Sequence, residues 1–406
     1  MHKVVQINSF NGGSTGRIAK LINEKARANG WETSFFYGRS WGYTGTEEHR
    51  IATKLSVWIH FIFARLFDCV GLMSVLTTLR LIRKLRRIEP DIVHLHNIHG
   101  YYINYWLLFK YLKKDRPKVV WTLHDCWPFT GHCAHFDLAG CKKWMSYCSN
   151  CPLLKEYPQS ILCDFSKYNY KLKRNLFTSI SDKLYLVPVS HWMDDILEFS
   201  FLKEITSLVI HNGVDTKETF IPRDGTHLLL KYGLQNKKVL LGVASPWNIK
   251  KGLYDFKRLV NLIDKEIYAI VMVGVDEQLA KQMPEGIITI PKTHSVEELS
   301  QWYSVADMFL NLTYEDNFPT TNIEALACGT PVITYKTGGS PEAITLATGL
   351  VVSQGDMNGL VDAINRIASR GKSQYSYECR KRAISHFDKD LCFDKYIELY
   401  KNIIRL

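Results

Sequence analysis

The residues best suited to chemistry lie in one stretch, residues 313–332, with the sequence TYEDNFPTTNIEALACGTPV. The pattern predicts a strand that ends near Leu312, a loop with two acids, and a helix that begins near Thr320. The first turn of a helix offers free backbone N–H groups and the positive end of the helix dipole to an anion. Carboxylates such as Glu324, in the early turns, can accept hydrogen bonds from sugar hydroxyls. The stretch therefore predicts a site for a phosphate and a sugar diol.

A second loop suited to phosphate binding is residues 245–252, with the sequence SPWNIKKG. It follows a predicted strand, and lysine in a loop that opens a helix can neutralise a diphosphate. Lys250 and Lys251 are therefore candidate phosphate ligands. A pair of ordinary surface lysines is the alternative interpretation.

A glycine-rich loop, residues 11–16 (NGGSTG), follows the first predicted strand. Gly12 and Gly13 would let the backbone approach a ligand closely, and the helix expected after them would attract a phosphate. The loop matches neither G-x-G-x-x-G nor the Walker pattern, so a tight turn without a ligand is the alternative.

His124 ends another predicted strand, residues 119–123, in the sequence TLHDCWP. A histidine at the carboxyl end of a strand can donate a hydrogen bond to a sugar hydroxyl or help to shape a site. A packed histidine without a ligand is the alternative interpretation.

A cluster of cysteines follows this histidine. Four of the ten cysteines lie close together in the chain: Cys133, Cys141, Cys148 and Cys151. Four thiolates on one short loop suit a structural zinc ion or, less often, an iron–sulfur cluster. His132 and His135 are alternative ligands, because the first cysteine pair is spaced more widely than in a standard zinc knuckle. Reduced free thiols and disulfides are the other interpretations.

Two series of alternating strands and helices must position these residues. The first series has β-rich runs at 4–7, 92–95, 119–123 and 185–189, and the second has them at 239–243, 269–273, 287–290, 308–312 and 331–334. Such alternation predicts parallel sheets with helices on both faces. Ligands of open α/β sheets bind beyond the carboxyl ends of the strands. We therefore predict an α/β protein with two doubly wound, Rossmann-like domains that face a cleft.

The expected N-terminal domain covers residues 1–205 and contains the cysteine-rich loop at 126–163. The expected C-terminal domain covers residues 206–385, and a C-terminal helix follows at 386–406. The turn-rich segment 211–215, HNGVD, lies near the predicted boundary.

The net charge of +11 is confined to the first half of the chain. Residues 1–200 hold 27 Lys and Arg against 16 Asp and Glu, whereas residues 201–406 hold 24 against 24. An anionic membrane surface or a phosphate-bearing lipid would suit this charge. Nucleic acid is the less favoured partner, because no recognised binding motif accompanies the charge. A solubilising surface is the alternative.

Residues 55–76 are strongly apolar and nearly long enough to span a bilayer. His60, Arg65 and Asp68 fall in the middle, where charges in a bilayer are costly. We therefore expect one amphipathic helix, either in the core or at a membrane surface. A basic segment follows with five cationic residues: Arg80, Arg83, Lys84, Arg86 and Arg87.

The first residues, 1–7, run straight into a buried-strand pattern, without the basic and apolar segments of a secretory signal. We therefore expect a cytoplasmic protein. Peripheral attachment to the inner face of the cytoplasmic membrane is compatible with the apolar helix and the basic first half.

Several motifs together resemble one enzyme family. Asp316 and Glu324 stand eight residues apart and precede ALACGTPV, which resembles the E-x7-E element of retaining glycosyltransferases of the GT-B fold, family four. Lys251-Gly252 resembles the K-G donor loop of this family, and residues 212–215 resemble its N-G-V-D linker. His124 and the Gly12-Gly13 pair match further elements, so the resemblance spans about residues 3 to 345.

The resemblance implies roles for these residues. His124, Asp316 and Lys251 would be catalytic: His124 and Asp316 would contact the donor sugar, and Lys251, with Lys250, would neutralise the leaving diphosphate. Glu324 would bind the nucleotide ribose. The remaining donor-binding residues would be Gly12, Gly13, Thr293, Asn317, Phe318, Pro319, Thr320 and Thr321. Asp316 departs from the usual glutamate, and Pro246 stands where the family often has arginine.

The resemblance also implies a function. The chain would be a hexosyltransferase-type enzyme that transfers a sugar with retention from a nucleotide diphosphate sugar. Its acceptor would be a saccharide or a polyprenyl-diphosphate-linked saccharide in bacterial polysaccharide biosynthesis, and catalysis would require no cofactor. The C-terminal helix would return toward the N-terminal domain. A nucleotide-sugar epimerase and a non-catalytic sugar- or nucleotide-binding protein are the alternatives that share this architecture.

Overall fold

A computed structural model describes residues 1–40, 45 and 48–405. The chain divides into two compact units. The first unit is Met1–His211 with Phe393–Leu406, and the second is Asn212–Cys392. Each unit is considered by itself below.

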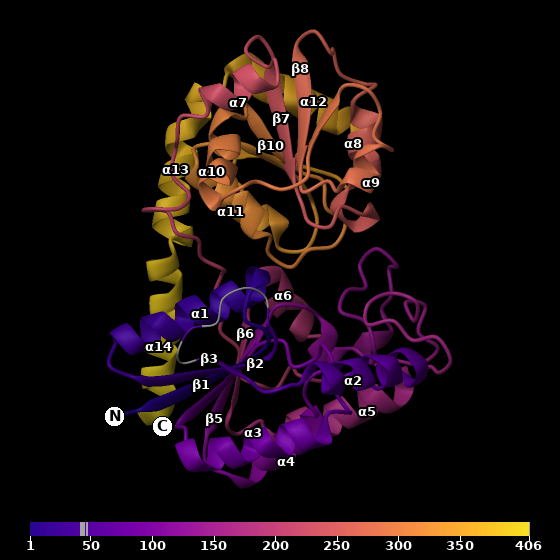
Figure 1. The fold of residues 1–406 in the computed structure, drawn as a ribbon, viewed down its shortest axis with the longest axis vertical. Coiled ribbons are helices and arrows are strands. Elements are labelled where there is room, and N and C mark those ends of the chain that lie inside the picture. The colour runs from indigo at the N-terminus through magenta and orange to yellow at the C-terminus, as the bar shows by residue number, and fades with distance from the viewer. Residues whose placement is uncertain (41–44, 46–47, 406) are drawn as a thin grey trace. The chain divides into compact units, whose positions relative to one another are not determined.

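The first unit has a six-stranded parallel sheet in the order β3-β2-β1-β4-β5-β6. Its strands are β1 (Lys3–Phe10), β2 (Glu32–Arg39), β3 (Glu48–Arg50), β4 (Ile92–Leu95), β5 (Lys118–Leu123) and β6 (Leu184–Pro188). Its helices are α1 (Gly13–Ala28), α2 (Lys54–Phe67), α3 (Val75–Ile88), α4 (Tyr105–Lys114), α5 (Ser166–Phe177), α6 (His191–Leu197) and most of α14 (Lys389–Arg405). Figure 1 shows α3 and α4 side by side along one edge of this unit.

The core of the first unit follows from the two-residue period of its strands. Alternate residues of β1, β4 and β5, such as Val5, Val93 and Val119, belong to the main apolar cluster. The residues between them point to the opposite face, where Gln6 contacts Tyr400 of α14. The same period therefore separates an apolar face from a face that carries polar side chains.

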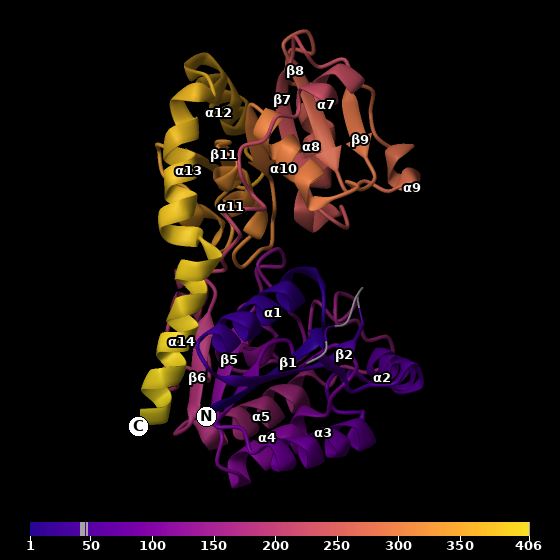
Figure 2. The ribbon, with the colours of Figure 1, turned by 60° about the vertical axis from the view of Figure 1, so that its left-hand side comes forward.

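The second unit has a six-stranded parallel sheet in the order β12-β11-β10-β7-β8-β9. Its strands are β7 (Lys238–Val243), β8 (Tyr268–Val273), β9 (Ile287–Ile290), β10 (Met308–Asn311), β11 (Val332–Tyr335) and β12 (Gly349–Val352). Its helices are α7 (Thr226–Lys231), α8 (Leu253–Leu259), α9 (Glu277–Ala280), α10 (Val296–Val305), α11 (Thr320–Ala327), α12 (Met357–Arg370) and α13 (Ser373–Phe387). Figure 2 shows α13 running along the side of this unit next to α11, with which it packs.

Both sheets are wound in two directions from their first strand, and helices pack against them. The predicted α/β fold with two doubly wound, Rossmann-like sheets is therefore confirmed. The sequence pattern did not reveal β2, β3 or β12, which extend the two sheets away from their central strands.

The single helix expected at residues 55–76 is wrong. The chain forms α2 and α3 instead, and the break lies at Asp68, whose φ of 50° is left-handed. The Asp68 carboxylate is buried and lies 2.6 Å from Nδ1 of His132, while its other oxygen accepts the Phe165 N–H. This pairing holds the acid in the interior, because a buried carboxylate is stable there only with such partners.

The first of these two helices, α2, lies at the surface of its unit. It buries only His60 and Ala64, whereas its large apolar side chains include six that are exposed: Leu55, Trp58, Ile59, Phe61, Phe63 and Phe67. Within the part of the chain that the structure describes, no helix has both the length and the apolar character that crossing a membrane requires.

Candidate functional site

The topology of the second unit singles out one edge of its sheet. The chain runs from β7 outward to β8 and β9 on one side, then crosses to β10 on the other side. Ligands of open α/β sheets bind at the point where the strand order reverses, beyond the carboxyl ends of the strands. The loops that follow β7 and β10 meet this condition, and they contain the predicted lysines and acids.

The loop after β7 is built to lie close to β10. Asn248 accepts the N–H of Lys251 and so caps a single turn at Ile249–Lys251. Gly252 follows with a φ of 75°, and a Cβ added there would lie 2.2 Å from the carbonyl oxygen of Leu312. Only glycine combines this backbone conformation with so close an approach. The lysines are thereby held against the end of the neighbouring strand.

Two ion pairs join the loops that follow β7 and β10. Lys251 Nζ lies 2.7 Å from Oδ2 of Asp316, and Lys250 Nζ lies 2.8 Å from Oε2 of Glu315. The Tyr314 N–H also donates to the Lys250 carbonyl oxygen at 2.7 Å. The structure thus brings Lys250, Lys251 and Asp316 together. An anion that binds these lysines would compete with the two carboxylates.

The segment after Asp316 leads directly into α11. Asn317 and Phe318 are buried, and Thr320 begins the helix. No side chain of the described residues caps the N-terminus of α11. Backbone N–H groups of a first turn that lack a side-chain cap are suited to an anion. The strand end, loop and helix start predicted around residues 313–332 are thus present, and the phosphate site itself stays a prediction.

Glu324 lies in the second turn of α11 and is 5% exposed. The Tyr303 hydroxyl donates to its Oε2 at 3.0 Å, so the carboxylate has a fixed orientation. A buried, oriented carboxylate can accept hydrogen bonds from a diol. Tyr303, on α10, was not among the predicted site residues.

A glycine pair after β11 also belongs to this region and was not predicted. A Cβ added at Gly338, which has a φ of 49°, would lie 1.8 Å from the Asp316 carbonyl oxygen. The Gly339 N–H donates to the Asn317 carbonyl oxygen at 3.1 Å. The adjacent glycines in TGGS were the signal in the sequence, since such pairs mark close backbone approach.

Three predicted positions remain: two complete these loops, and one stands apart from them. Pro319 precedes α11, and Thr321 lies in its first turn beside Thr320. Thr293 is partly exposed in the loop after β9, the edge strand that lies two positions from β7. The predicted role of Thr293 therefore stays a prediction.

The glycine loop of the first unit opens a helix as predicted from its sequence. Gly12 directly precedes α1, and Gly13 has a φ of 68°. A Cβ added at Gly16 would lie 2.7 Å from the Asn11 carbonyl carbon, so this turn of α1 packs tightly on the end of β1. β1 and β4 flank the switch point of this sheet, and the loop is thus at the edge where ligands bind.

His124 belongs to a row of polar side chains on one face of the first sheet. The same period that buries Val93 and Val119 turns His94 and His96 of the β4 segment to the opposite face. The rings of His94 and His96 are stacked with centroids 4.3 Å apart, and His96 and His124 are stacked at 5.2 Å.

Hydrogen bonds determine which ring nitrogen of His96 carries the proton. The Gln6 amide donates to the Tyr400 hydroxyl at 3.2 Å, so its Oε1, 2.7 Å from His96 Nε2, is the acceptor. His96 therefore carries its proton on Nε2 and accepts at Nδ1, which lies 2.9 Å from His124 Nε2. Burial lowers the pKa of His124 to about 4 and the pKa of His96 well below its usual range. Both rings are neutral at physiological pH.

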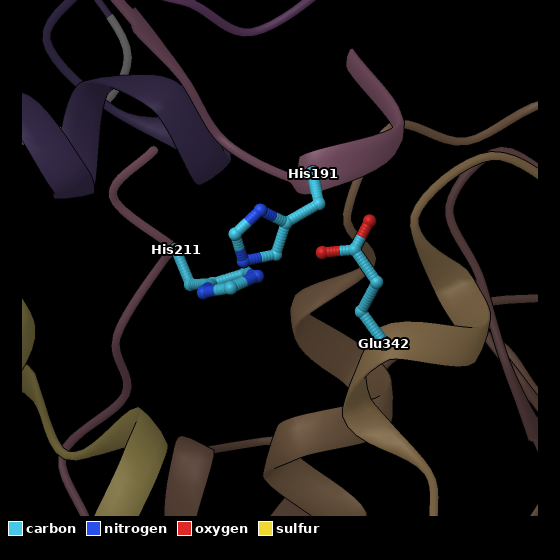
Figure 3. Close-up of side chains that lie close together, drawn as sticks. All are labelled: His191, His211 and Glu342. Carbon is cyan, nitrogen blue, oxygen red and sulfur yellow. The ribbon is translucent and has the colours of Figure 1, made fainter. Parts of the chain in front are cut away.

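His191 and His211 form another pair of histidines, near the end of the first chain segment of this unit. The rings of His191 and His211 meet edge-on with centroids 5.4 Å apart, as Figure 3 shows. His191 is exposed at the start of α6, and His211 is partly buried. Glu342, which the figure also labels, belongs to the second unit.

The cysteine loop forms one cluster around a small cavity. Cys133, Cys141, Cys148 and Cys151 all line this cavity, together with His132. Cys133 and Cys148 are buried, and the other two are partly exposed. His135, the other histidine considered from the sequence, is not among the residues that line the cavity.

Two family models match the chain. The model described as Glycosyltransferase Family 4 matches residues 12–218, which is more than half of the chain, and the model described as Glycosyl transferases group 1 matches residues 237–370. The two doubly wound units define a two-domain α/β protein. The chain belongs to glycosyltransferase family 4, and the predicted resemblance is confirmed.

One curated relative is similar over almost the full length. The putative colanic acid biosynthesis glycosyl transferase WcaC of Escherichia coli K12 is 24% identical over 413 residues, which cover 97% of both chains. The sucrose-phosphate synthase of Thermosynechococcus elongatus has the same fold, with a TM-score of 0.73 at 16% identity over all of both chains. Anabaena HepE, solved with UDP-glucose, has a TM-score of 0.67 at 13% identity over 99% of this chain and all of HepE. These likenesses confirm the GT-B fold.

Proposed function

We propose that the chain transfers a sugar, with retention of anomeric configuration, from a nucleoside diphosphate sugar to a saccharide or lipid-linked saccharide in bacterial polysaccharide biosynthesis. The observation that carries this proposal is the 2.7 Å contact of Lys251 with Asp316 at the switch point of the second sheet. The contact unites a cation for the diphosphate with an acceptor for sugar hydroxyls, beside the N-terminus of α11. HepE, which was solved with UDP-glucose, supports the choice of donor class.

The chemistry follows from the charges of this region. Transfer breaks the bond between the anomeric carbon and the diphosphate oxygen and joins the acceptor hydroxyl oxygen to the same face of that carbon, while the hydroxyl proton passes to the leaving diphosphate. Negative charge therefore grows on the diphosphate as the bond breaks. Lys251, Lys250 and the first N–H groups of α11 would stabilise that charge, which lowers the barrier. Lys251 would exchange Asp316 for a phosphate oxygen when the donor binds, and the freed carboxylate would accept hydrogen bonds from the donor sugar. No metal is needed for this step.

Glu324 would accept the ribose hydroxyls, as acidic residues do in other Rossmann-like folds. Its buried position and its bond to Tyr303 keep the carboxylate in one orientation. His124, whose Nε2 proton is donated to His96, would contact the donor sugar and help to orient it, and Gly12 and Gly13 would allow a close approach of the substrate to the start of α1.

The acceptor we propose is carried by a polyprenyl diphosphate at an anionic membrane surface. The exposed apolar side chains of α2, which include Trp58 and Phe63, would enter the interface. The basic residues of α3, which include Arg83 and Arg86, are exposed and would attract anionic headgroups. The name of the relative WcaC, which refers to colanic acid biosynthesis, supports a polysaccharide acceptor.

A donor screen tests the proposed reaction. The purified chain is incubated with a panel of nucleoside diphosphate sugars, and mass spectrometry measures binding and slow hydrolysis. One donor should be hydrolysed, and the sugar first released should keep the anomeric configuration of the donor in proton NMR spectra. Release with the opposite configuration would exclude retention. An epimerised donor would assign the chain to a different reaction.

A vesicle flotation assay tests the membrane surface separately. Vesicles with anionic lipids should bind the wild-type chain in a salt-sensitive manner, and vesicles of neutral lipids should bind it less. The double change Trp58→Ser and Phe63→Ser should abolish binding. As a control, Tyr254→Ser alters an exposed aromatic residue of α8 and should leave binding unchanged. Equal binding of all three proteins would contradict the proposed surface.

A further inference from the structure

The cavity of the cysteine loop has the size and the lining of an ion site that the proposed sugar transfer does not use. Its lining includes five potential ligands: His132, Cys133, Cys141, Cys148 and Cys151. Its volume is about 10 Å³, which is room for about one water molecule or one ion. Thiolates with an imidazole are the donors that zinc prefers in structural sites.

His132 distinguishes this cavity from an ordinary group of packed thiols. The His132 side chain is 0% exposed, and its Nδ1 lies 2.6 Å from Oδ1 of Asp68. Its Nε2 is also buried, and it has no hydrogen-bond partner among the residues that the structure describes. A buried polar atom without a partner is costly. A metal ion at Nε2 would satisfy it, and a carboxylate on the other ring nitrogen is the common support of a metal-bound histidine.

The thiols are gathered by close backbone packing. The Gly131 N–H donates to Cys148 Sγ at 3.2 Å. A Cβ added at Gly131 would lie 2.3 Å from the Ser166 carbonyl oxygen and 2.7 Å from Cys148 Cβ, so only glycine fits between α5 and the loop. A backbone N–H that donates to sulfur favours the thiolate, which is the form that binds a metal.

A buried lysine lies beside the loop, and burial lowers its pKa to about 7. Lys173 is 1% exposed, and its ammonium donates to the carbonyl oxygens of Trp127 and Thr130 at 2.7 and 3.1 Å. Thr130 in turn donates to the carbonyl oxygen of Cys133. A buried cation is costly unless a negative group compensates it. A zinc ion with three thiolates and one imidazole carries a net charge of −1.

We propose that this cavity binds one structural zinc ion through His132 Nε2 and three of the four thiolates, with Asp68 as the positioning residue. No three of these donor atoms lie mutually within 4.8 Å in the described chain, so the ion would draw the loop inward as it binds. Asp68 also ends α2 and accepts the Phe165 N–H. The metal would therefore fasten the loop at residues 126–163 to the end of α2 and the start of α5.

The first experiment measures metal in the full chain as purified. Plasma mass spectrometry should find about one zinc ion per chain. Replacement by cobalt should give a thiolate-to-cobalt charge-transfer band and the visible bands of a tetrahedral ion. A chain that holds no zinc, takes up no cobalt and has ten reactive thiols would overturn the proposal. A mass lowered by the formation of disulfides would overturn it equally.

Single substitutions identify the ligands. Three of the four changes Cys133→Ser, Cys141→Ser, Cys148→Ser and Cys151→Ser should abolish stoichiometric zinc, and His132→Gln should do the same. Cys379→Ser is the control, because this buried cysteine lies in the second unit with its thiol directed to the Thr348 carbonyl oxygen. Loss of zinc with all four cysteine changes, together with full retention in His132→Gln, would overturn the assignment of His132. If a cysteine variant fails to fold, the cobalt spectrum of the wild-type chain still decides the question.

Asp68→Asn tests the positioning role. Removal of a carboxylate behind a metal-bound histidine weakens metal binding by about 10- to 100-fold. A competition titration with a chromophoric chelator should therefore give a zinc dissociation constant raised by that factor, while the cobalt spectrum keeps its tetrahedral form. An unchanged constant in a folded Asp68→Asn chain would show that Asp68 has only a structural role at the end of α2.

Discussion

The two units hold their candidate functional groups in opposite ways. In the second unit, Lys251 and Asp316 are ionic, come from loops after neighbouring strands, and neutralise each other at a partly exposed position. In the first unit, His96 and His124 are neutral and are held by a network that extends to Gln6 and Tyr400. The ion pair of the second unit can exchange one charged partner for another at little cost. The network of the first unit fixes the orientation of its histidines, and its disruption costs stability.

This difference makes separate predictions for affinity, rate and stability. Substitutions in the loops of the second unit should change ligand binding and turnover without unfolding the chain. Substitutions of the buried His94 and His96 of the first unit should change stability and leave nucleotide affinity intact. The following predictions run from the largest expected effect to the smallest.

Lys251→Ala should have the largest effect. Loss of one group that stabilises developing charge typically lowers kcat by about 100- to 1000-fold. Affinity for the matching nucleoside diphosphate should fall as well, while the melting temperature should not change, because the lysine is partly exposed. Steady-state kinetics and calorimetry measure both quantities. Lys281→Ala removes an exposed lysine elsewhere in the second unit and is the control. Equal kinetics of the two variants would contradict the proposed role.

Glu324→Gln should weaken binding of the nucleoside diphosphate by about 10- to 100-fold, because a hydrogen bond to a charged group is worth about 1.5–3 kcal/mol. The loss should be confined to ligands that have ribose hydroxyls. Calorimetry with a ribonucleoside diphosphate and its 2′,3′-dideoxy counterpart separates the cases. The wild-type chain should prefer the ribonucleotide, and Glu324→Gln should bind both alike. A preference that survives the substitution would assign the ribose to another residue.

Acid should destabilise the first unit through its buried histidines, His94 and His96. The pKa values of His94 and His96 are depressed well below 6.5 by burial, so the folded chain binds fewer protons than the unfolded chain at low pH. Their contribution is therefore complete above about pH 6.5 and is lost as the pH falls toward the folded pKa values. Between pH 6.5 and 5.5 the unfolding free energy should fall by about 1 kcal/mol for each of these two buried histidines.

Urea unfolding at a series of pH values measures this slope. His94→Gln should reduce it, whereas His294→Gln, a change at an exposed histidine of the second unit, should leave it unaltered. An unfolding free energy of the first unit that is constant from pH 6.5 to 5.5 would show that these rings are protonated in the folded state.

Tyr400→Phe should have the smallest effect. The Tyr400 hydroxyl accepts from Gln6 and lies 2.5 Å from His94 Nδ1, so its removal should cost about 1–2 kcal/mol of unfolding free energy. Nucleotide affinity should not change, because Tyr400 belongs to the first unit. Urea unfolding and calorimetry on the same preparation check both statements. A large loss of nucleotide affinity would contradict the separation of roles between the units.

The sequence predicted the loops of the second unit well because their order along the chain is local. A strand end, a loop and a helix start follow one another in residues 308–327, and each has its own signal. The ion pair of Lys251 with Asp316 was not visible in the sequence, but it follows once β7 and β10 are neighbours.

The features that the sequence did not predict depend on contacts between distant residues. The helix break at Asp68 depends on His132, 64 residues further along the chain. The neutral row around His96 needs Gln6 and Tyr400, which are 394 residues apart. Local periodicity contains no information about such partners, so a long apolar run was interpreted as one helix. The close approach of Gly338 to Asp316 was missed for the same reason.

The most direct test of the central claim is a crystal structure of the chain with a bound nucleoside diphosphate. The account predicts that Lys251 Nζ leaves Asp316 and lies within hydrogen-bonding distance of the diphosphate, that N–H groups of the first turn of α11 point at the same phosphate, and that Glu324 contacts the ribose. A diphosphate bound elsewhere, with the Lys251–Asp316 pair intact, would contradict it.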